Sequence, residues 1–113
     1  MEKYVVMIKS NAAPGRDADY EDWYNNIHLD EILRLPGFVS GRQFRVRNEN
    51  GVEHSAFSHV ALFEIESEDV DATLGNLRST FTSGAMTLTD ALDVTKASER
   101  SIFQATGAVQ YCK

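Results

Sequence analysis

The sequence has few of the features that define several large protein classes. Its single cysteine, Cys112, has no partner for an internal disulfide and lies beside the C-terminus, so we expect neither a disulfide framework nor a catalytic thiol. No segment approaches the roughly 20 apolar residues of a membrane helix. Residues 1–9 lack the apolar core and cleavage site of a signal peptide. These absences predict a cytoplasmic protein that does not bind membranes.

Positive charge is also scarce. The 113 residues include 11 lysines and arginines against 17 aspartates and glutamates, a formal net charge of −6, and no basic cluster stands out. Nucleic-acid binding needs concentrated positive charge to contact phosphates, so we expect no nucleic-acid partner. With 42% hydrophobic residues and no repeat or linker, the chain predicts one globular domain over residues 1–113 with one modest core.

Apolar patterning and turn residues predict six main elements. Strands are expected at Tyr4–Ile8, Phe38–Arg47, Ser58–Glu66 and Ser101–Tyr111. Helices are expected from near Asp17 to the Pro36-Gly37 stop and over Glu68–Phe81, with an additional helical turn at Met86–Leu92. Asn50-Gly51, between the middle strands, is a hairpin signal because both residues tolerate positive φ.

The order β-α-β-β-α-β predicts an α+β, ferredoxin-like fold, with a four-stranded antiparallel sheet and both helices on one face. The runs Val5–Ile8 and Val60–Phe63 are continuously apolar, whereas a half-exposed strand should alternate. Because two helices cover only one face, the other face would expose an apolar patch unusual for a soluble monomer. A second copy of the sheet is the simplest cover, which predicts a homodimer through the sheet faces. The alternative is that the segment after Gly84 folds over that face.

The first helix carries a motif that resembles a known family. The segment Asp22–Phe38, DWYNNIHLDEILRLPGF, follows APGR at Ala13–Arg16 and resembles the EthD-like branch of the dimeric α/β-barrel superfamily. The segment Thr89–Asp93, TDALD, is similar to the tail of that group. The resemblance implies a ferredoxin-like fold, a dimeric α/β barrel formed by two sheets, and a pocket between the sheet and the helices of each subunit.

Proteins of the wider superfamily include cofactor-free polyketide cyclases and monooxygenases, lactone isomerases and haem-degrading monooxygenases. The haem-degrading branch uses an Asn-Trp-His set in another arrangement, and the only tryptophan here, Trp23, lies in the first helix. The resemblance therefore favours chemistry without a cofactor, and fold alone does not choose among the remaining activities.

His28 is the strongest candidate for a catalytic residue. It follows Tyr24 by four residues and Tyr20 by eight, so the three side chains share the helix face that we expect to pack on the sheet. A semi-buried neutral imidazole can take a proton from an acidic carbon or a phenol and return it elsewhere. The alternative is a structural histidine hydrogen-bonded to a neighbour near the helix end. We predict His28 as general acid/base and Tyr24 as its hydrogen-bonding partner.

The other candidates would line a pocket for a hydrophobic small molecule. They are Tyr20, Trp23, Arg42, Phe44, His59, Phe63 and Phe81. Simple alternation places Phe38, Ser40, Arg42 and Phe44 on one face of the second strand and Arg45 on the other, so at most one arginine reaches a given pocket. Either arginine could anchor a carboxylate or enolate oxygen, or could be an edge-strand charge that discourages aggregation.

The histidines do not predict a metal site. His59 begins the third strand and could point into the pocket or into the dimer interface, or make only a structural hydrogen bond, while His54 lies just past the hairpin tip. No pair of the three histidines has a spacing that would place two nitrogens on one ion, and no acidic residue completes a set. The sequence therefore predicts no metal and no cofactor.

Three functions remain open at this point. The first is a small cofactor-independent enzyme acting on a hydrophobic aromatic or cyclic carbonyl compound by proton transfer, as a cyclase, isomerase, lyase or monooxygenase does. The second is a non-catalytic, small-molecule-binding or stress-associated dimer of the same fold. The third is haem binding. Loss of turnover in a folded His28 variant would separate the first from the second, and a Soret shift on adding haemin would identify the third.

Overall fold

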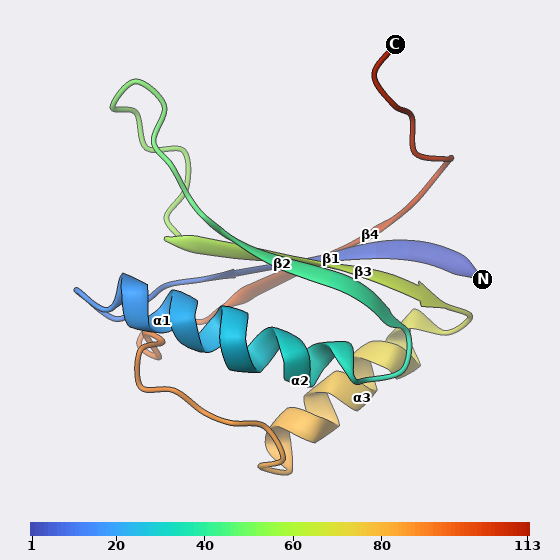
Figure 1. The fold of residues 1–113 in the computed structure, drawn as a ribbon, viewed down its shortest axis with the longest axis horizontal. Helices are drawn as coiled ribbons and strands as arrows, with labels where there is room; N and C mark the ends of the chain where they lie inside the picture. Colours follow the sequence, from blue (N-terminus) through green and yellow to red (C-terminus); the bar gives the residue numbers. More distant parts are fainter.

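The computed structural model describes all residues 1–113 and has the predicted α+β, ferredoxin-like order (Figure 1). The elements are β1 (Glu2–Ser10), α1 (Asp17–Trp23), η1 (Tyr24–His28), α2 (Leu29–Leu33), β2 (Phe38–Arg45), β3 (His59–Ser67), α3 (Val70–Thr82) and β4 (Glu99–Gln104). β1 is longer at both ends than expected, and β4 ends seven residues earlier than expected. No helix is long and apolar enough to span a membrane.

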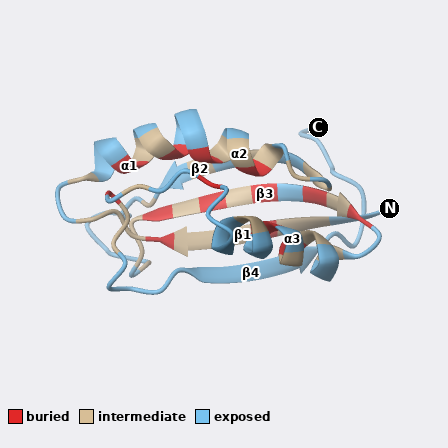
Figure 2. Ribbon diagram, turned by 90° about the horizontal axis from the view of Figure 1, so that it is seen from below, coloured by how far each residue is buried: buried red, intermediate tan, exposed pale blue.

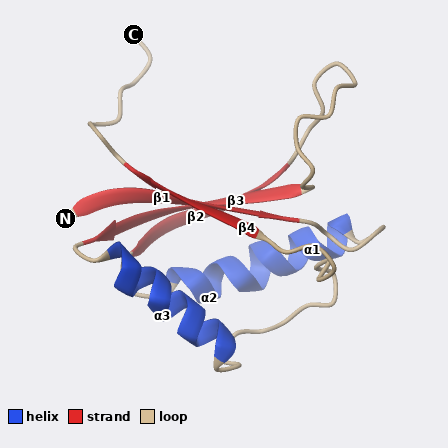
Figure 3. Cartoon of the chain, turned by 180° about the vertical axis from the view of Figure 1, so that it is seen from behind, coloured by secondary structure: helices blue, strands red, loops and turns tan.

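The four strands form one antiparallel sheet in the order β2-β3-β1-β4. The two central strands, β1 and β3, are the two that carry the continuous apolar runs. All helices lie on one face of the sheet (Figures 1 and 3). This confirms the four-stranded antiparallel sheet with helices on a single face.

The main core lies between the sheet and the helices (Figure 2). Val6 on β1 stands opposite Phe63 on β3, and both are fully buried. Ile65 continues this row and packs with Leu74 of α3 in a smaller cluster. Every second residue of these strands therefore faces the helices, which places the remaining apolar residues of the two runs on the opposite, open face.

A bulge in β2 changes which of its residues face the helices. Phe38 is paired with Ile65, but the register shifts between Phe38 and Ser40, so Gly41 is the next residue on the helix face. The expectation from simple alternation, which grouped Phe38 with Ser40, was wrong for this reason. A Cβ at Gly41 would lie 2.7 Å from the ring of Phe63, so the glycine makes room for that buried ring.

The first helix is one continuous body whose middle turn is a π-helix. Its buried residues occur at every fourth position and are Tyr20, Tyr24, His28 and Ile32. A spacing of four exceeds the 3.6 residues of an α-helical turn, so a regular helix would rotate this row away from the sheet. The wider π turn keeps the row aligned. Ile27 lies off this row and is 38% exposed.

Residues 84–98 run along the helix side of the molecule, from the end of α3 toward the start of α1 (Figure 1). The amide of Ala13 donates to the carbonyl of Ala91 at 2.6 Å, and the amide of Asp93 donates to the carbonyl of Asn11 at 2.8 Å. The helical turn expected at Met86–Leu92 does not form. Residues 84–98 therefore do not cover the open face, whereas the tail at 105–111 borders one end of it, near Val5 and Glu64.

The open face keeps its apolar residues in partial contact with solvent. Val5 pairs with Phe103 across the β1–β4 boundary, and Phe44 pairs with Val60 across the β2–β3 boundary. Phe103 is 49% exposed and Phe44 is 41% exposed. The loop at 46–58 and the C-terminal tail both project beyond this face, at opposite ends of the sheet (Figures 1 and 3).

Candidate functional site

A cavity of about 280 Å³ lies between the first helix, α3 and the sheet. Five of the predicted site residues line it, namely His28, Tyr24, Tyr20, Trp23 and Phe81. The cavity wall is mostly apolar, and its few polar groups include the hydroxyls of the serines at 10 and 98. Such a mainly apolar cavity with a few polar groups suits a hydrophobic small molecule.

His28 is enclosed by aromatic rings. Its imidazole stacks on the indole of Trp23, with ring centres 4.4 Å apart and planes inclined by 18°. Tyr24 and Phe81 meet the imidazole edge to face, at 4.9 Å and 5.4 Å between ring centres. Trp23 and His28 are five residues apart, and the π turn, whose hydrogen bonds join residues five apart, brings them to the same side of the helix.

This enclosure keeps the imidazole neutral. His28 is only 5% exposed, and burial lowers its pKa from 6.5 to about 4, with a small opposing effect from the carboxylate of Glu31. Its Nδ1 is buried and has no hydrogen-bond partner in the chain. The alternative for His28 was a structural histidine held by a hydrogen bond to a neighbour. Nδ1 makes no such hydrogen bond.

The two tyrosines of the row have different surroundings. The hydroxyl of Tyr20 lies 2.7 Å from Oγ of Ser10, and burial raises the pKa of this tyrosine. Burial raises the pKa of Tyr24 far above its ordinary value, so its hydroxyl stays protonated. Tyr24 contacts His28 through its ring edge, and no hydrogen bond between the two residues is present, in contrast to the predicted partnership.

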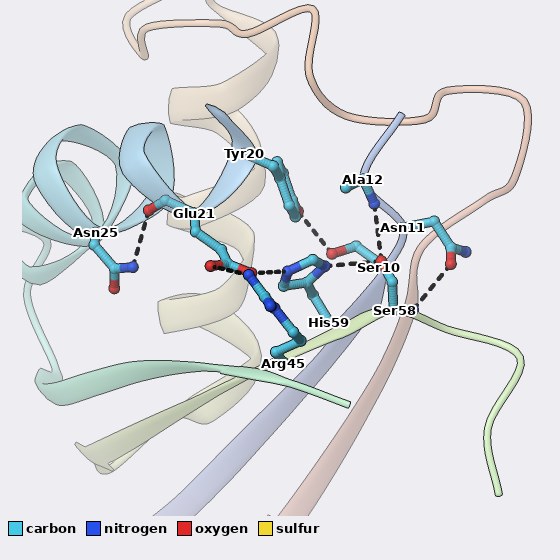
Figure 4. Close-up of polar contacts among 9 residues, drawn as sticks. All are labelled: Ser10, Asn11, Ala12, Tyr20, Glu21, Asn25, Arg45, Ser58 and His59. Carbon is cyan, nitrogen blue, oxygen red and sulfur yellow. Dashed lines mark hydrogen bonds and ion pairs between the residues drawn. The ribbon is translucent and has the colours of Figure 1, made fainter. Parts of the chain in front are cut away.

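His59 is itself fully buried and belongs to a second polar network on the helix side (Figure 4). Its Nε2 lies 2.8 Å from Oε2 of Glu21, and its Nδ1 lies 2.8 Å from Oγ of Ser58. Oγ of Ser58 also accepts from the amide of Ala12 at 3.0 Å. A carboxylate only accepts hydrogen bonds, so Nε2 carries a proton and donates to Glu21. His59 thus points toward the helices and not toward a second copy.

Arg45 completes this network by binding Glu21 with two nitrogens, at 2.7 Å and 2.8 Å. This guanidinium is the main cause that holds the pKa of Glu21 below its usual value, and the hydrogen bond from His59 adds to it. Glu21 was missed in the sequence because acidic residues crowd that helix turn and none stands out. Its partners lie 24 and 38 residues away, so only the folded chain brings them together.

The structure does not bring four predicted pocket residues to the cavity. Arg42 and Phe44 lie on the open face, where the guanidinium sits 5.4 Å from the centre of the phenyl ring. Phe63 is fully buried in the core beneath Gly41. His59 does not line the cavity, although it meets the ring of Tyr20 edge to face at 5.2 Å and pairs with Ser10 across the strands. The bulge and the pleat of the sheet turn Arg42 and Phe44 away from the cavity, whereas Phe63 and His59 face the helices elsewhere along β3.

No three histidine, cysteine, aspartate or glutamate side chains lie close enough together to hold a metal ion. Glu31 is the acidic residue whose charge affects His28. Its carboxylate accepts hydrogen bonds from the amide and the hydroxyl of Thr87, both at 3.0 Å. The chemistry available at the cavity is therefore that of a neutral imidazole, tyrosine hydroxyls and aromatic walls.

Several solved structures resemble this chain in fold. No protein-family model matches the sequence, and no curated protein matches it. Among solved structures, an EthD family protein from Bacillus halodurans C-125 matches with a TM-score of 0.57 and 16% identity, over 94% of this chain and 100% of that one. The haem-degrader MhuD from Mycobacterium tuberculosis matches with a TM-score of 0.64 and 13% identity, over 95% and 99%.

A monooxygenase from the gene ActVA-Orf6 of Streptomyces coelicolor, in complex with nanaomycin D, matches with a TM-score of 0.59 and 16% identity, over 98% and 93%. Further matches include a cofactor-independent oxygenase, a dimeric ferredoxin-like protein and a protein of unknown function. At these identities the likeness concerns the fold. The chain shares the α+β ferredoxin-like fold of these structures, and the resemblance of its first helix to the EthD-like branch agrees with its match to an EthD family protein.

Proposed function

We propose that the protein is a small enzyme that moves protons on a hydrophobic aromatic or cyclic carbonyl compound, with His28 as the acid/base residue. The observation that carries this proposal is a neutral imidazole, stacked on Trp23 and buried in the wall of a mostly apolar cavity. A neutral imidazole has a nitrogen lone pair that can accept a proton. The aromatic walls supply flat surfaces for a ring-shaped ligand.

The reaction begins with transfer of a proton from an acidic carbon or phenol of the ligand to the imidazole. The electron pair of the broken bond moves onto the ligand oxygen as an enolate or phenolate. A pKa of about 4 makes His28 a weak base in the empty cavity. The anion formed beside the imidazolium raises that pKa, because an opposite charge in a poorly solvated site favours the charged form. His28 then returns the proton to another atom of the ligand.

Tyr24 would assist this step as a hydrogen-bond donor to the ligand oxygen. It lines the cavity next to His28, and its raised pKa keeps the hydroxyl protonated when a negative oxygen forms nearby. This role replaces the direct hydrogen bond to His28 that the sequence suggested. Proton transfer between these groups and a ligand requires no cofactor, and among the structural neighbours a cofactor-independent oxygenase and a nanaomycin-binding monooxygenase share this fold.

We also propose that the working form is a homodimer through the open faces of two sheets. The apolar side chains of that face, among them Phe44 and Phe103, are the ones that a second sheet would remove from water. The loop at 46–58 and the C-terminal tail stand beyond the two ends of the face, where they would flank a second copy (Figure 3). A structural neighbour is a dimeric ferredoxin-like protein.

The competing function is non-catalytic binding of the same ligand class, and the low pKa of His28 favours it because the free residue is a weak base. Thermal-shift screening of a metabolite library would find ligands, since a ligand that binds only the folded state raises the melting temperature. Ketone ligands found in this way would be incubated in D2O, and exchange at the carbon next to the carbonyl would be followed by proton NMR.

The enzyme proposal expects exchange or turnover with the wild-type chain and a loss of about 100-fold or more in His28→Asn, the size typical of a lost acid/base group. His54→Asn, on the exposed loop, is the matched control and should keep full activity. Full activity in folded His28→Asn would refute the assignment. Ligand binding without exchange or turnover in the wild type would support the carrier function instead.

A further inference from the structure

A second hollow of about 400 Å³ opens directly beside the cavity that holds His28. The two spaces share wall residues, since Ile8, Leu77, Phe81 and Ser98 line both of them. The second hollow lies between α3 and β4. The two spaces together therefore form an inner chamber beside His28 and an outer chamber (the second hollow) at the α3–β4 edge.

Two arginines distinguish the outer chamber from the inner one. Arg78 of α3 and Arg100 of β4 both line it, and one acidic residue, Glu99, lines it with them. The inner chamber has no lysine, arginine, aspartate or glutamate in its wall. Positive charge is thus confined to one end of the combined space, and it exceeds the negative charge there by one.

These two guanidinium groups have no ion-pair partner in the chain. The arginines at 16, 34 and 45 each bind a carboxylate at 3.0 Å or less. Neither Arg78 nor Arg100 takes part in any ion pair, although acidic residues outnumber basic ones by 17 to 11 in this chain. Arg42 and Arg47 also lack an ion pair, but only Arg78 and Arg100 line one hollow together, where an anionic ligand would supply a shared partner.

We infer that the ligand carries a carboxylate or another acidic group that binds Arg78 and Arg100 in the outer chamber, while its apolar ring system lies beside His28. This inference rests on the proposed function, because it takes the inner chamber as the site of the ring. Guanidinium groups bind carboxylates through paired hydrogen bonds, and the partly apolar wall strengthens the attraction relative to open water.

The acidic group would also fix which atom of the ring meets the imidazole. A flat ring in an aromatic cavity can slide or turn, whereas a ligand held at one end by two arginines has one preferred orientation. Such positioning makes proton transfer faster because the reacting atoms are already aligned. Arg78 and Arg100 are positioning residues in this view, and His28 remains the group that touches the reacting atom.

The test uses two probes of nearly the same shape, the anionic 2-naphthoic acid and the neutral 2-naphthamide, measured at pH 7 by calorimetry. Trp23 is the only tryptophan and lines the inner chamber, so a change in tryptophan fluorescence reports that the ring enters it. We expect the acid to bind about tenfold more tightly than the amide, the size of one good charge-assisted contact. Raising the salt concentration should weaken binding of the acid and leave the amide unchanged.

The variants Arg78→Gln and Arg100→Gln should each lower the acid-to-amide affinity ratio by about threefold or more without changing amide binding. Arg47→Gln, which removes the same charge from an exposed site just after β2, is the matched control and should keep the wild-type ratio. Equal binding of the two probes, or an equal loss in Arg47→Gln, would overturn the inference and leave the proposed function standing. Failure of both probes to bind or to change Trp23 fluorescence would overturn both.

Discussion

Replacing His28 by phenylalanine should make the protein more resistant to mild acid. The imidazole is neutral in the folded chain, with a pKa of about 4, whereas in the unfolded chain its pKa is 6.5. Between these values the unfolded state binds a proton that the folded state does not, so stability is full above pH 6.5 and falls as the pH drops toward 4. Phenylalanine keeps an aromatic ring in the stack and cannot titrate.

The two pKa values give the size of the effect. Linkage predicts a loss of about 2 kcal/mol between pH 7 and pH 5, and of about 3 kcal/mol by pH 4. Urea unfolding of the wild type and of His28→Phe would be followed by circular dichroism at several pH values and one fixed protein concentration. Altered packing in the variant changes its free energy of unfolding by the same amount at every pH. The comparison therefore uses only how the difference between the two proteins changes with pH.

The expected result is that the stability difference between the variant and the wild type shifts by about 2 kcal/mol in favour of the variant as the pH falls from 7 to 5. His54→Phe, at an exposed loop position, should show a much smaller shift. Glu21 does not contribute to this shift. Its pKa lies below its ordinary value of 4.5, so the stability that it provides is lost only below the pH range compared here. A difference that stays constant from pH 7 to pH 5 would refute the enclosed neutral imidazole.

Three further outcomes follow from the packing and the ion pairs. Gly41→Ala should lower the free energy of urea unfolding by about 1–3 kcal/mol, because the new Cβ would lie 2.7 Å from the ring of Phe63; an unchanged midpoint would show that the ring is free to move. Leu62→Lys on the open face should weaken dimerisation by at least about 100-fold in analytical ultracentrifugation, because it would bury an unpaired charge, and an undisturbed dimer would place the interface elsewhere. Arg45→Leu should raise the pKa of Glu21 toward 4.5, as seen by NMR titration of the carboxyl carbon, and acid unfolding should begin at a higher pH; an unchanged titration would contradict the ion pair.

Much of the fold could be predicted because it depends on local patterns. The two apolar runs became the central strands, the first helix ends at Leu33, three residues before Pro36, and Asn50 and Gly51 both have positive φ as the hairpin signal required. The residues that share one face of a helix or strand recur with a period of a few positions, so this pattern can be recognised directly in a sequence. The resemblance of the first helix to the EthD-like branch identified the same fold.

The candidate site could be predicted in part. His28, Tyr24, Tyr20 and Trp23 come from one helix, so their shared position follows from their spacing. The buried row has a spacing of four residues, which is longer than an α-helical turn and therefore indicates the π turn. Our sequence analysis expected a regular helix and did not use this signal. That turn is what stacks Trp23 on the imidazole.

The remainder depended on contacts between distant parts of the chain. The bulge in β2 placed Arg42 and Phe44 away from the cavity, because one extra residue in a strand reverses the face of those around it. Arg78 and Arg100 meet only because α3 crosses β4. Local spacing decides which residues share one helix face, whereas the meeting of residues from separate elements depends on how the whole chain packs.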